Sequence, residues 1–129
     1  MDKNERQRIY RSRTGNDNTK KYEKTPNGFL MRLYRNMESR ITGVQWMKAH
    51  LYDGKELLPR EDFYQWAKCQ TFRRMFKTYE NSGYDRKLAP SVDRIDSSKG
   101  YTIDNMEWVT HSENSRRGNV AKRIAYNQK

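Results

Sequence analysis

The sequence predicts a mainly helical α+β protein that ends in a strand–strand–helix unit. Residues 91–95 and 106–109 are short runs rich in Val, Ile and Trp, which suit strands with one buried face. The polar residues 96–104 lie between them and are expected to form a loop. Thr110 is followed three positions later by Glu113, a capping-box pattern that marks the start of a helix.

Two stretches upstream of this unit have apolar residues at helical spacing. From Phe29 to Ile41 such residues recur every three or four positions, and Gly43 is expected to end the helix. A second stretch begins at Pro59 and continues to Tyr79, as one long helix or as two consecutive helices. The helical part of the fold is therefore predicted to precede the strands.

We expect three regions along the chain. Residues 1–25 are basic and contain almost no apolar residue, so they are expected to form a flexible arm. Residues 26–84 are expected to form a helical support. Residues 85–129 are expected to contain the strand–strand–helix unit and to end in a basic helix.

The composition indicates a polyanionic partner. Among 129 residues, 27 are Lys or Arg and 16 are Asp or Glu, which gives a formal net charge of +11. Because many of the cations are interleaved with aromatic residues, nucleic acid is the expected partner, ahead of a basic protein that is merely soluble. The single cysteine, Cys69, excludes an intramolecular disulfide and a cysteine-based zinc site, and we expect it to be a buried thiol.

No part of the sequence predicts an association with a membrane. The chain contains no apolar run near the roughly 18 residues that a membrane span requires. Residues 1–5 do not resemble a signal peptide. We therefore expect a cytoplasmic protein, with a monomer as the default state.

Four polar residues of the strand–strand–helix unit have a characteristic spacing. Asp93 and Arg94 lie on the first strand, Asn105 precedes the second, and Asn114 lies nine residues further on, in the helix. The segment that starts at Asn105 reads Asn-Met-Glu-Trp-Val-Thr. Over residues 90–118, this pattern resembles the ββα-metal motif of HNH endonucleases of the phage-encoded and homing type. Those enzymes have Asp-His, Asn and a second Asn at the corresponding positions, and a similar Asn-Leu-Arg-Trp-Val-Thr segment.

The resemblance implies a metal-dependent, phage-type deoxyribonuclease that hydrolyses phosphodiester bonds in double-stranded DNA, either nicking or cutting it. Asp93 and Asn114 would bind one divalent ion, with Mg²⁺ expected ahead of Mn²⁺ because both residues offer hard oxygen ligands. No structural zinc is expected. Asn105 would tie the loop to the strands and orient the catalytic base.

Arg94 departs from the family pattern, which has a His general base at this position. A guanidinium remains protonated at physiological pH, so Arg94 cannot remove a proton from water, and we expect it to hold the phosphate. His111, three residues before the predicted metal ligand in the helix, is the leading candidate for the base. The alternatives are Asp96, His50 and a metal-bound hydroxide without a protein base.

The helix after the second strand is also expected to contact DNA. The residues expected to bind phosphates are Arg116, Arg117, Lys122 and Arg123. Two alternatives to the nuclease stay open: a catalytically inactive DNA-binding or accessory protein on the same fold, and an RNA-binding protein. In the RNA-binding alternative, Asp93 and Asn114 would share no ligand.

Overall fold

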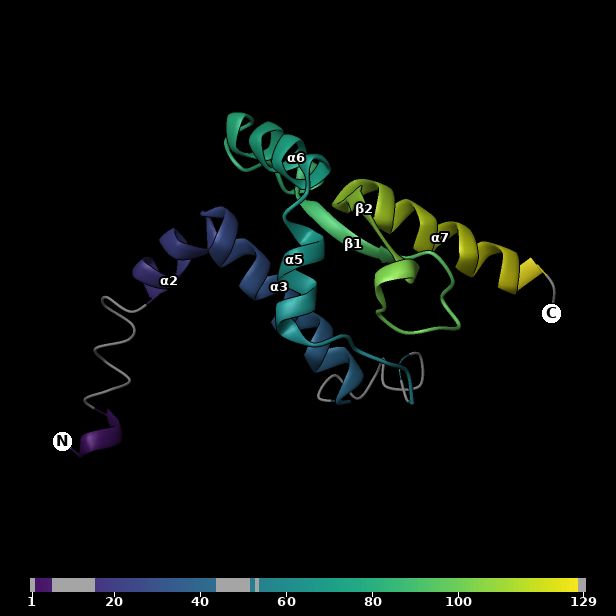
Figure 1. The fold of residues 1–129 in the computed structure, drawn as a ribbon, viewed down its shortest axis with the longest axis horizontal. Helices are drawn as coiled ribbons and strands as arrows, with labels where there is room; N and C mark the ends of the chain where they lie inside the picture. Colours follow the sequence, from purple (N-terminus) through teal and green to yellow (C-terminus); the bar gives the residue numbers. More distant parts are fainter. Residues whose placement is uncertain (1, 6–15, 44–51, 53, 128–129) are drawn as a thin grey trace. The chain divides into compact units, whose positions relative to one another are not determined.

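The computed structural model describes residues 2–5, 16–43, 52 and 54–127 (Figure 1). The chain divides into two compact units, Met1–Arg32 and Leu33–Lys129. Helix α3, Pro26–Ile41, contains the division between them. The two units are described separately.

The first unit contains α2, Asn16–Glu23, and the start of α3. The hydroxyl of Thr25 donates to the Tyr22 carbonyl oxygen at 2.6 Å and accepts the Gly28 amide hydrogen at 3.2 Å. One side chain therefore closes the end of α2 and caps the start of α3.

The amino-terminal region, predicted to form a basic arm, contains a helix. Residues 6–15 lie outside the described part of the chain, whereas residues 16–23 form α2. Arg32 pairs with the Glu23 carboxylate at 3.4 Å. This helix depends on local capping and pairing, which a search for apolar periodicity does not detect.

In the second unit, the rest of α3 is followed by α5, Arg60–Ala67, and α6, Gln70–Asn81. The two helices are separate because Cys69 has an extended backbone (φ −99°, ψ 174°) immediately before α6. At this position Cys69 is exposed, so the prediction of a buried thiol is wrong. Gly83 and Tyr84 then have left-handed φ angles of 77° and 66°, and the chain turns away from the axis of α6.

A strand–strand–helix unit follows, as the sequence predicted. Strands β1, Pro90–Arg94, and β2, Met106–Thr110, form a two-stranded antiparallel sheet, and α7, His111–Asn127, begins directly after β2. The short 3₁₀ helices η3, Arg86–Leu88, and η4, Ile103–Asn105, precede β1 and β2. The Thr110 hydroxyl accepts the Glu113 amide hydrogen at 3.2 Å, which caps α7.

The two faces of the hairpin have different partners because side chains alternate along a strand. Val92 lies opposite Trp108 in the register, and both belong to one face. On this face, the Trp108 ring stacks on Trp66 of α5 (centroids 5.3 Å apart) and packs against Phe72 of α6 (4.9 Å). Phe63 and Phe76 are buried in the same core. The aromatic periodicity of the upstream helices therefore belongs to the core.

The other face carries Asp93 and its register partner Glu107, and it meets α7. In Figure 1, α6 and α7 lie beside the hairpin. Helix α7 has 17 residues. Neither it nor any other helix in the described ranges is long and apolar enough to cross a membrane.

The loop between the strands is pinned by a backbone contact from the segment before α5. Leu57 forms an isolated parallel bridge with Tyr101. The Tyr101 amide donates to the Glu56 carbonyl at 2.7 Å, and the Leu58 amide donates to the Tyr101 carbonyl at 2.9 Å. A Cβ on Gly100 would lie 2.2 Å from the Glu56 oxygen, so only glycine permits this approach.

Candidate functional site

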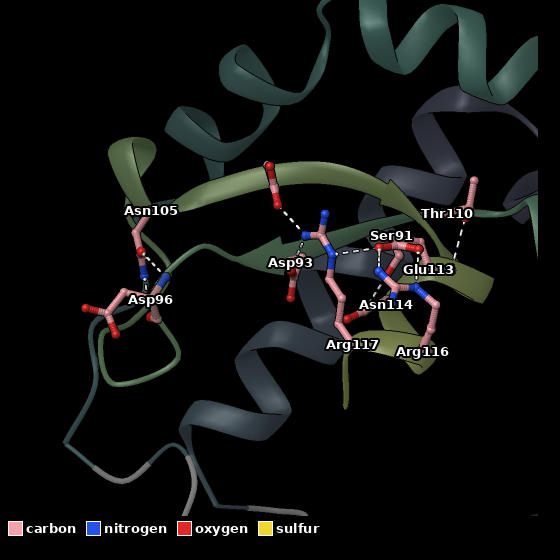
Figure 2. A network of polar contacts seen from close by, with 10 residues as sticks. Ser91, Asp93, Asp96, Asn105, Thr110, Glu113, Asn114, Arg116 and Arg117 are labelled. Atoms are coloured by element: carbon pink, nitrogen blue, oxygen red, sulfur yellow. Dashed lines mark hydrogen bonds and ion pairs between the residues drawn. The ribbon is translucent and has the colours of Figure 1, made fainter. Parts of the chain in front are cut away.

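Asp93 and Asn114, the predicted metal ligands, lie on elements that face each other. The amide nitrogen of Asn114 on α7 donates to the hydroxyl of Ser91 on β1 at 2.8 Å. Ser91 and Asp93 are two residues apart on one strand, so their side chains leave the same face. The structure thus places the carboxylate and the amide between β1 and α7 (Figure 2).

Arg117 occupies the space next to Asp93. Its Nη1 donates to Asp93 Oδ2 at 2.8 Å and also to the Glu107 carboxylate, while its Nε donates to Glu113 Oε1 at 3.0 Å. Figure 2 shows the guanidinium between the strands and α7. We refer to Asp93, Glu107, Glu113 and Arg117 as the Arg117 cluster.

Hydrogen bonds within this cluster shift the pKa of Glu113 and that of Arg117, and both shifts favour the charged form of the side chain. Hydrogen bonds from Arg116, and then from Arg117, lower the pKa of Glu113 from 4.5 to about 2. Hydrogen bonds to Glu107, Asp93 and Glu113 raise the pKa of Arg117 above its ordinary value. The guanidinium is therefore a permanent positive charge among three carboxylates.

Asn105 is buried at the base of the loop and makes three hydrogen bonds. Its Oδ1 accepts the Asp96 amide hydrogen at 2.8 Å, and its Nδ2 donates to the carbonyls of Asp96 (3.1 Å) and Gly100 (2.8 Å). Both polar ends of the amide are thus satisfied. Through these bonds, Asn105 holds the loop in place.

Arg94 leaves the strand on the face opposite Asp93, because the two are neighbours in β1. Its Nη1 donates to the carbonyls of Ser97 and Lys99, each at 3.0 Å. Its guanidinium carbon lies 4.4 Å from the ring centre of Tyr52 and 5.7 Å from that of Tyr101. In this conformation Arg94 stabilises the loop, and the structure does not bring it to Asp93.

His111, the leading candidate for the base, bonds to residues outside the Arg117 cluster. Its Nε2 accepts from Arg86 Nε at 3.3 Å, and its Nδ1 lies 3.2 Å from the Ser115 hydroxyl. Because Nε2 is the acceptor, the neutral ring carries its hydrogen on Nδ1. The lone pair that a base would use is therefore engaged by Arg86.

The other candidates for the base are placed differently. The Asp96 carboxylate accepts from the amide and hydroxyl of Ser98 at 2.9 and 2.6 Å, and these bonds lower its pKa. Asp96 thus belongs to the turn that starts the loop. His50 lies outside the described residues.

The residues predicted to bind DNA separate into two groups. Arg117 and Arg116 are held by acids, and Arg116 makes two hydrogen bonds to Glu113, at 2.9 and 2.6 Å. Lys122 and Arg123 are exposed on α7. The sequence interpretation missed the acidic partners of Arg117. The i, i+4 spacing of Glu113 and Arg117 was the available signal.

The donor chemistry at Asp93 and Asn114 suits a hard divalent ion. A carboxylate oxygen and an amide oxygen are ligands that Mg²⁺ accepts. The Asn114 amide bonds Ser91 through its nitrogen, so this contact does not use the amide oxygen that would bind an ion. No group of three or more His, Cys, Asp or Glu side chains in those same ranges is arranged to hold a metal ion. Arg117 already bonds Asp93 Oδ2, so an ion at Asp93 would compete with the guanidinium for this carboxylate.

The chain matches no protein-family model, and comparisons with curated proteins and with solved structures also find no match. The chemistry of the site therefore depends on the residues described above.

Proposed function

We propose that the protein is a DNA endonuclease of the HNH type that hydrolyses phosphodiester bonds with one divalent ion. The observation that carries the proposal is the hydrogen bond between Asn114 and Ser91, which brings the amide to the face of β1 that carries Asp93. The satisfied side chain of Asn105 at the base of the loop supports the same motif. The RNA-binding alternative is less well supported, since side chains of Asp93 and Asn114 that lie far apart would have favoured it, whereas both lie between β1 and α7.

In this proposal, Asp93 and Asn114 would hold the ion, Mg²⁺ or Mn²⁺. A bound divalent ion would neutralise charge on the scissile phosphate and facilitate deprotonation of the attacking water. Arg117 leaves Asp93 and takes its positive charge toward the phosphate. Asn105 keeps the loop closed, and Arg94 supports it by bonding the carbonyls of Ser97 and Lys99.

His111 can serve as the base only after Arg86 releases its Nε2. A phosphate that attracts Arg86 would free this lone pair, so binding of DNA and activation of the base would be linked. His111→Ala with full activity would exclude this role.

The test is a plasmid-nicking assay with Mg²⁺ or Mn²⁺. We expect the wild type to convert supercoiled DNA to the open circle and Asp93→Ala to lose this activity. Asp62→Ala is the matched control, because Asp62 is an exposed aspartate of α5 outside the Arg117 cluster. An inert wild type, or an Asp93→Ala protein that nicks equally well, refutes the proposal.

A second candidate function is a DNA-binding protein without catalysis. The ion pair between Arg117 and Asp93 favours it, because a guanidinium already neutralises the carboxylate that the metal would need. The nicking assay separates the two candidates when it is combined with a binding measurement. Binding without nicking in either metal would favour this second candidate.

A further inference from the structure

A groove between η3 and α7 lies outside the Arg117 cluster. It is open to solvent, has a volume of about 700 Å³, and is lined by Asp85, by residues of η3 and by residues of α7 between positions 111 and 123. Glu113 and Arg117 are absent from its lining. The groove is therefore separate from the Arg117 cluster, although His111, the candidate base, belongs to its lining.

The walls of this η3–α7 groove are strongly basic. Four cationic side chains line it, against the single carboxylate of Asp85. The four are Arg86, Lys87, Arg116 and Arg123. Arg116 is engaged by Glu113 and Arg86 by His111. In the described part of the chain no carboxylate pairs with Lys87 or Arg123, and both are exposed.

The groove also has the geometry of an extended track. Ser112, Arg116, Asn119 and Arg123 follow one another at intervals of four, three and four residues, so they form one row along α7. With a rise of 1.5 Å per residue, this row is about 16 Å long. Hydroxyl and amide donors thus alternate with guanidinium groups along the helix, and η3 supplies the second wall.

We propose that the η3–α7 groove binds the sugar-phosphate backbone of double-stranded DNA. Arginine, lysine, serine and asparagine side chains are the usual donors to backbone phosphates. The lining contains no Phe, Tyr or Trp, so it offers no aromatic surface on which unpaired bases could stack. The groove therefore suits the backbone of a duplex better than single-stranded nucleic acid.

This inference goes beyond the proposed cleavage site, because the groove would bind DNA in either candidate function. It also assigns a role in phosphate binding to Arg86 and Lys87, which the sequence analysis did not identify as DNA-binding residues. DNA held in the groove would contact the face of α7 that carries Ser112, Arg116, Asn119 and Arg123. The duplex would then be fixed by one face of the helix while the other face remains next to Asp93.

The test compares two double substitutions in the full-length chain by fluorescence anisotropy with a short labelled DNA duplex over a series of salt concentrations. Lys87→Gln/Arg123→Gln removes the two unpaired cations of the groove. Arg73→Gln/Lys77→Gln removes the same pair of residue types from exposed positions on α6. Circular dichroism would establish that both variants are folded.

We expect the groove variant to lower the slope of log K against log salt by about 1.8, since each lost phosphate contact contributes about 0.9. The control should retain the slope of the wild type. Equal losses in the two variants, or tighter binding of single-stranded DNA or double-stranded RNA than of duplex DNA, would overturn the inference. If DNA binding depends on the groove but the wild type does not nick, only the proposed nuclease activity is refuted. If the wild type nicks DNA but the groove variant keeps the wild-type salt slope, only the proposed role of the groove is refuted.

Discussion

Arg117 on α7 donates to the Asp93 carboxylate of β1 at 2.8 Å, across 24 positions of sequence. The same guanidinium reaches Glu107 on β2 and Glu113 on its own helix. It thus connects both strands to the helix that follows them. It also places a fixed positive charge where the resemblance to HNH enzymes implies a divalent ion.

Removing Arg117 should strengthen metal binding at Asp93. In Arg117→Gln, the three carboxylates of the cluster lose their shared cation, so Mn²⁺ should bind at least about tenfold more tightly, or about 1.4 kcal/mol. Isothermal titration calorimetry measures this change without any cleavage assay. Arg116→Gln is the control, because Arg116 contacts Glu113 and makes no bond to Asp93. An Arg117→Gln affinity no higher than that of the control would show that Arg117 does not compete with the ion.

The loop should lose stability when Asn105 is replaced by aspartate. The substitution puts a carboxylate oxygen in place of Nδ2, next to the carbonyl oxygens of Asp96 and Gly100. Each buried acceptor left without a donor costs about 1–3 kcal/mol of unfolding free energy. Urea denaturation measures the loss, with Asn81→Asp at an exposed position of α6 as the control. Similar losses in both variants would mean that Asn105 does not hold the loop.

Two glycine-to-alanine substitutions should have opposite effects. At Gly100 the new methyl would meet the Glu56 backbone at 2.2 Å, so we expect a loss of about 1–3 kcal/mol or more. At Gly118, within α7, the new methyl would meet nothing within 4 Å beyond its own chain neighbours and the backbone of the helix, and alanine should stabilise the helix by about 0.5–1 kcal/mol. Thermal denaturation of the two variants provides the comparison. A Gly100→Ala protein as stable as the wild type would contradict the contact with Glu56.

The contribution of Glu113 should depend on pH in the acidic range. Its pKa falls from 4.5 to about 2 in the folded protein, so the stabilisation is fully present above pH 4.5 and disappears as the pH falls toward about 2. The difference in melting temperature between the wild type and Glu113→Gln should shrink over this interval. A carboxyl-detected NMR titration would locate the pKa directly. Arg116→Gln should raise that pKa toward its ordinary value, and an unchanged titration would contradict the assigned cause.

Local patterns predicted much of the fold. The Thr110 capping box marks the start of α7, and the alternation of β1 and β2 separates the Trp108 face from the Asp93 face. The break between α5 and α6 was left open, because both segments have compatible apolar spacing and the extended backbone of Cys69 has no strong sequence signal.

The candidate site was less predictable because its contacts join distant parts of the chain. The spacing of Asp93, Asn105 and Asn114 indicated three polar positions of one unit. The contact of Arg94 with Tyr52 and that of Gly100 with Glu56 each cross more than 40 positions. Nothing in the local sequence specifies such contacts. The hydrogen bond from Arg86 to His111 likewise joins residues that are distant in the sequence.

The hydrogen bond from the Asp96 amide to Asn105 Oδ1 makes one backbone hydrogen of the loop depend on a side chain. Amide protons in the middle of β1 exchange with solvent when the strands separate, whereas the Asp96 proton exchanges when the Asn105 side chain withdraws. Its exchange rate therefore reports opening of the loop independently of opening of the sheet. A hydrogen-exchange measurement on this single amide would show whether DNA or a divalent ion tightens the loop.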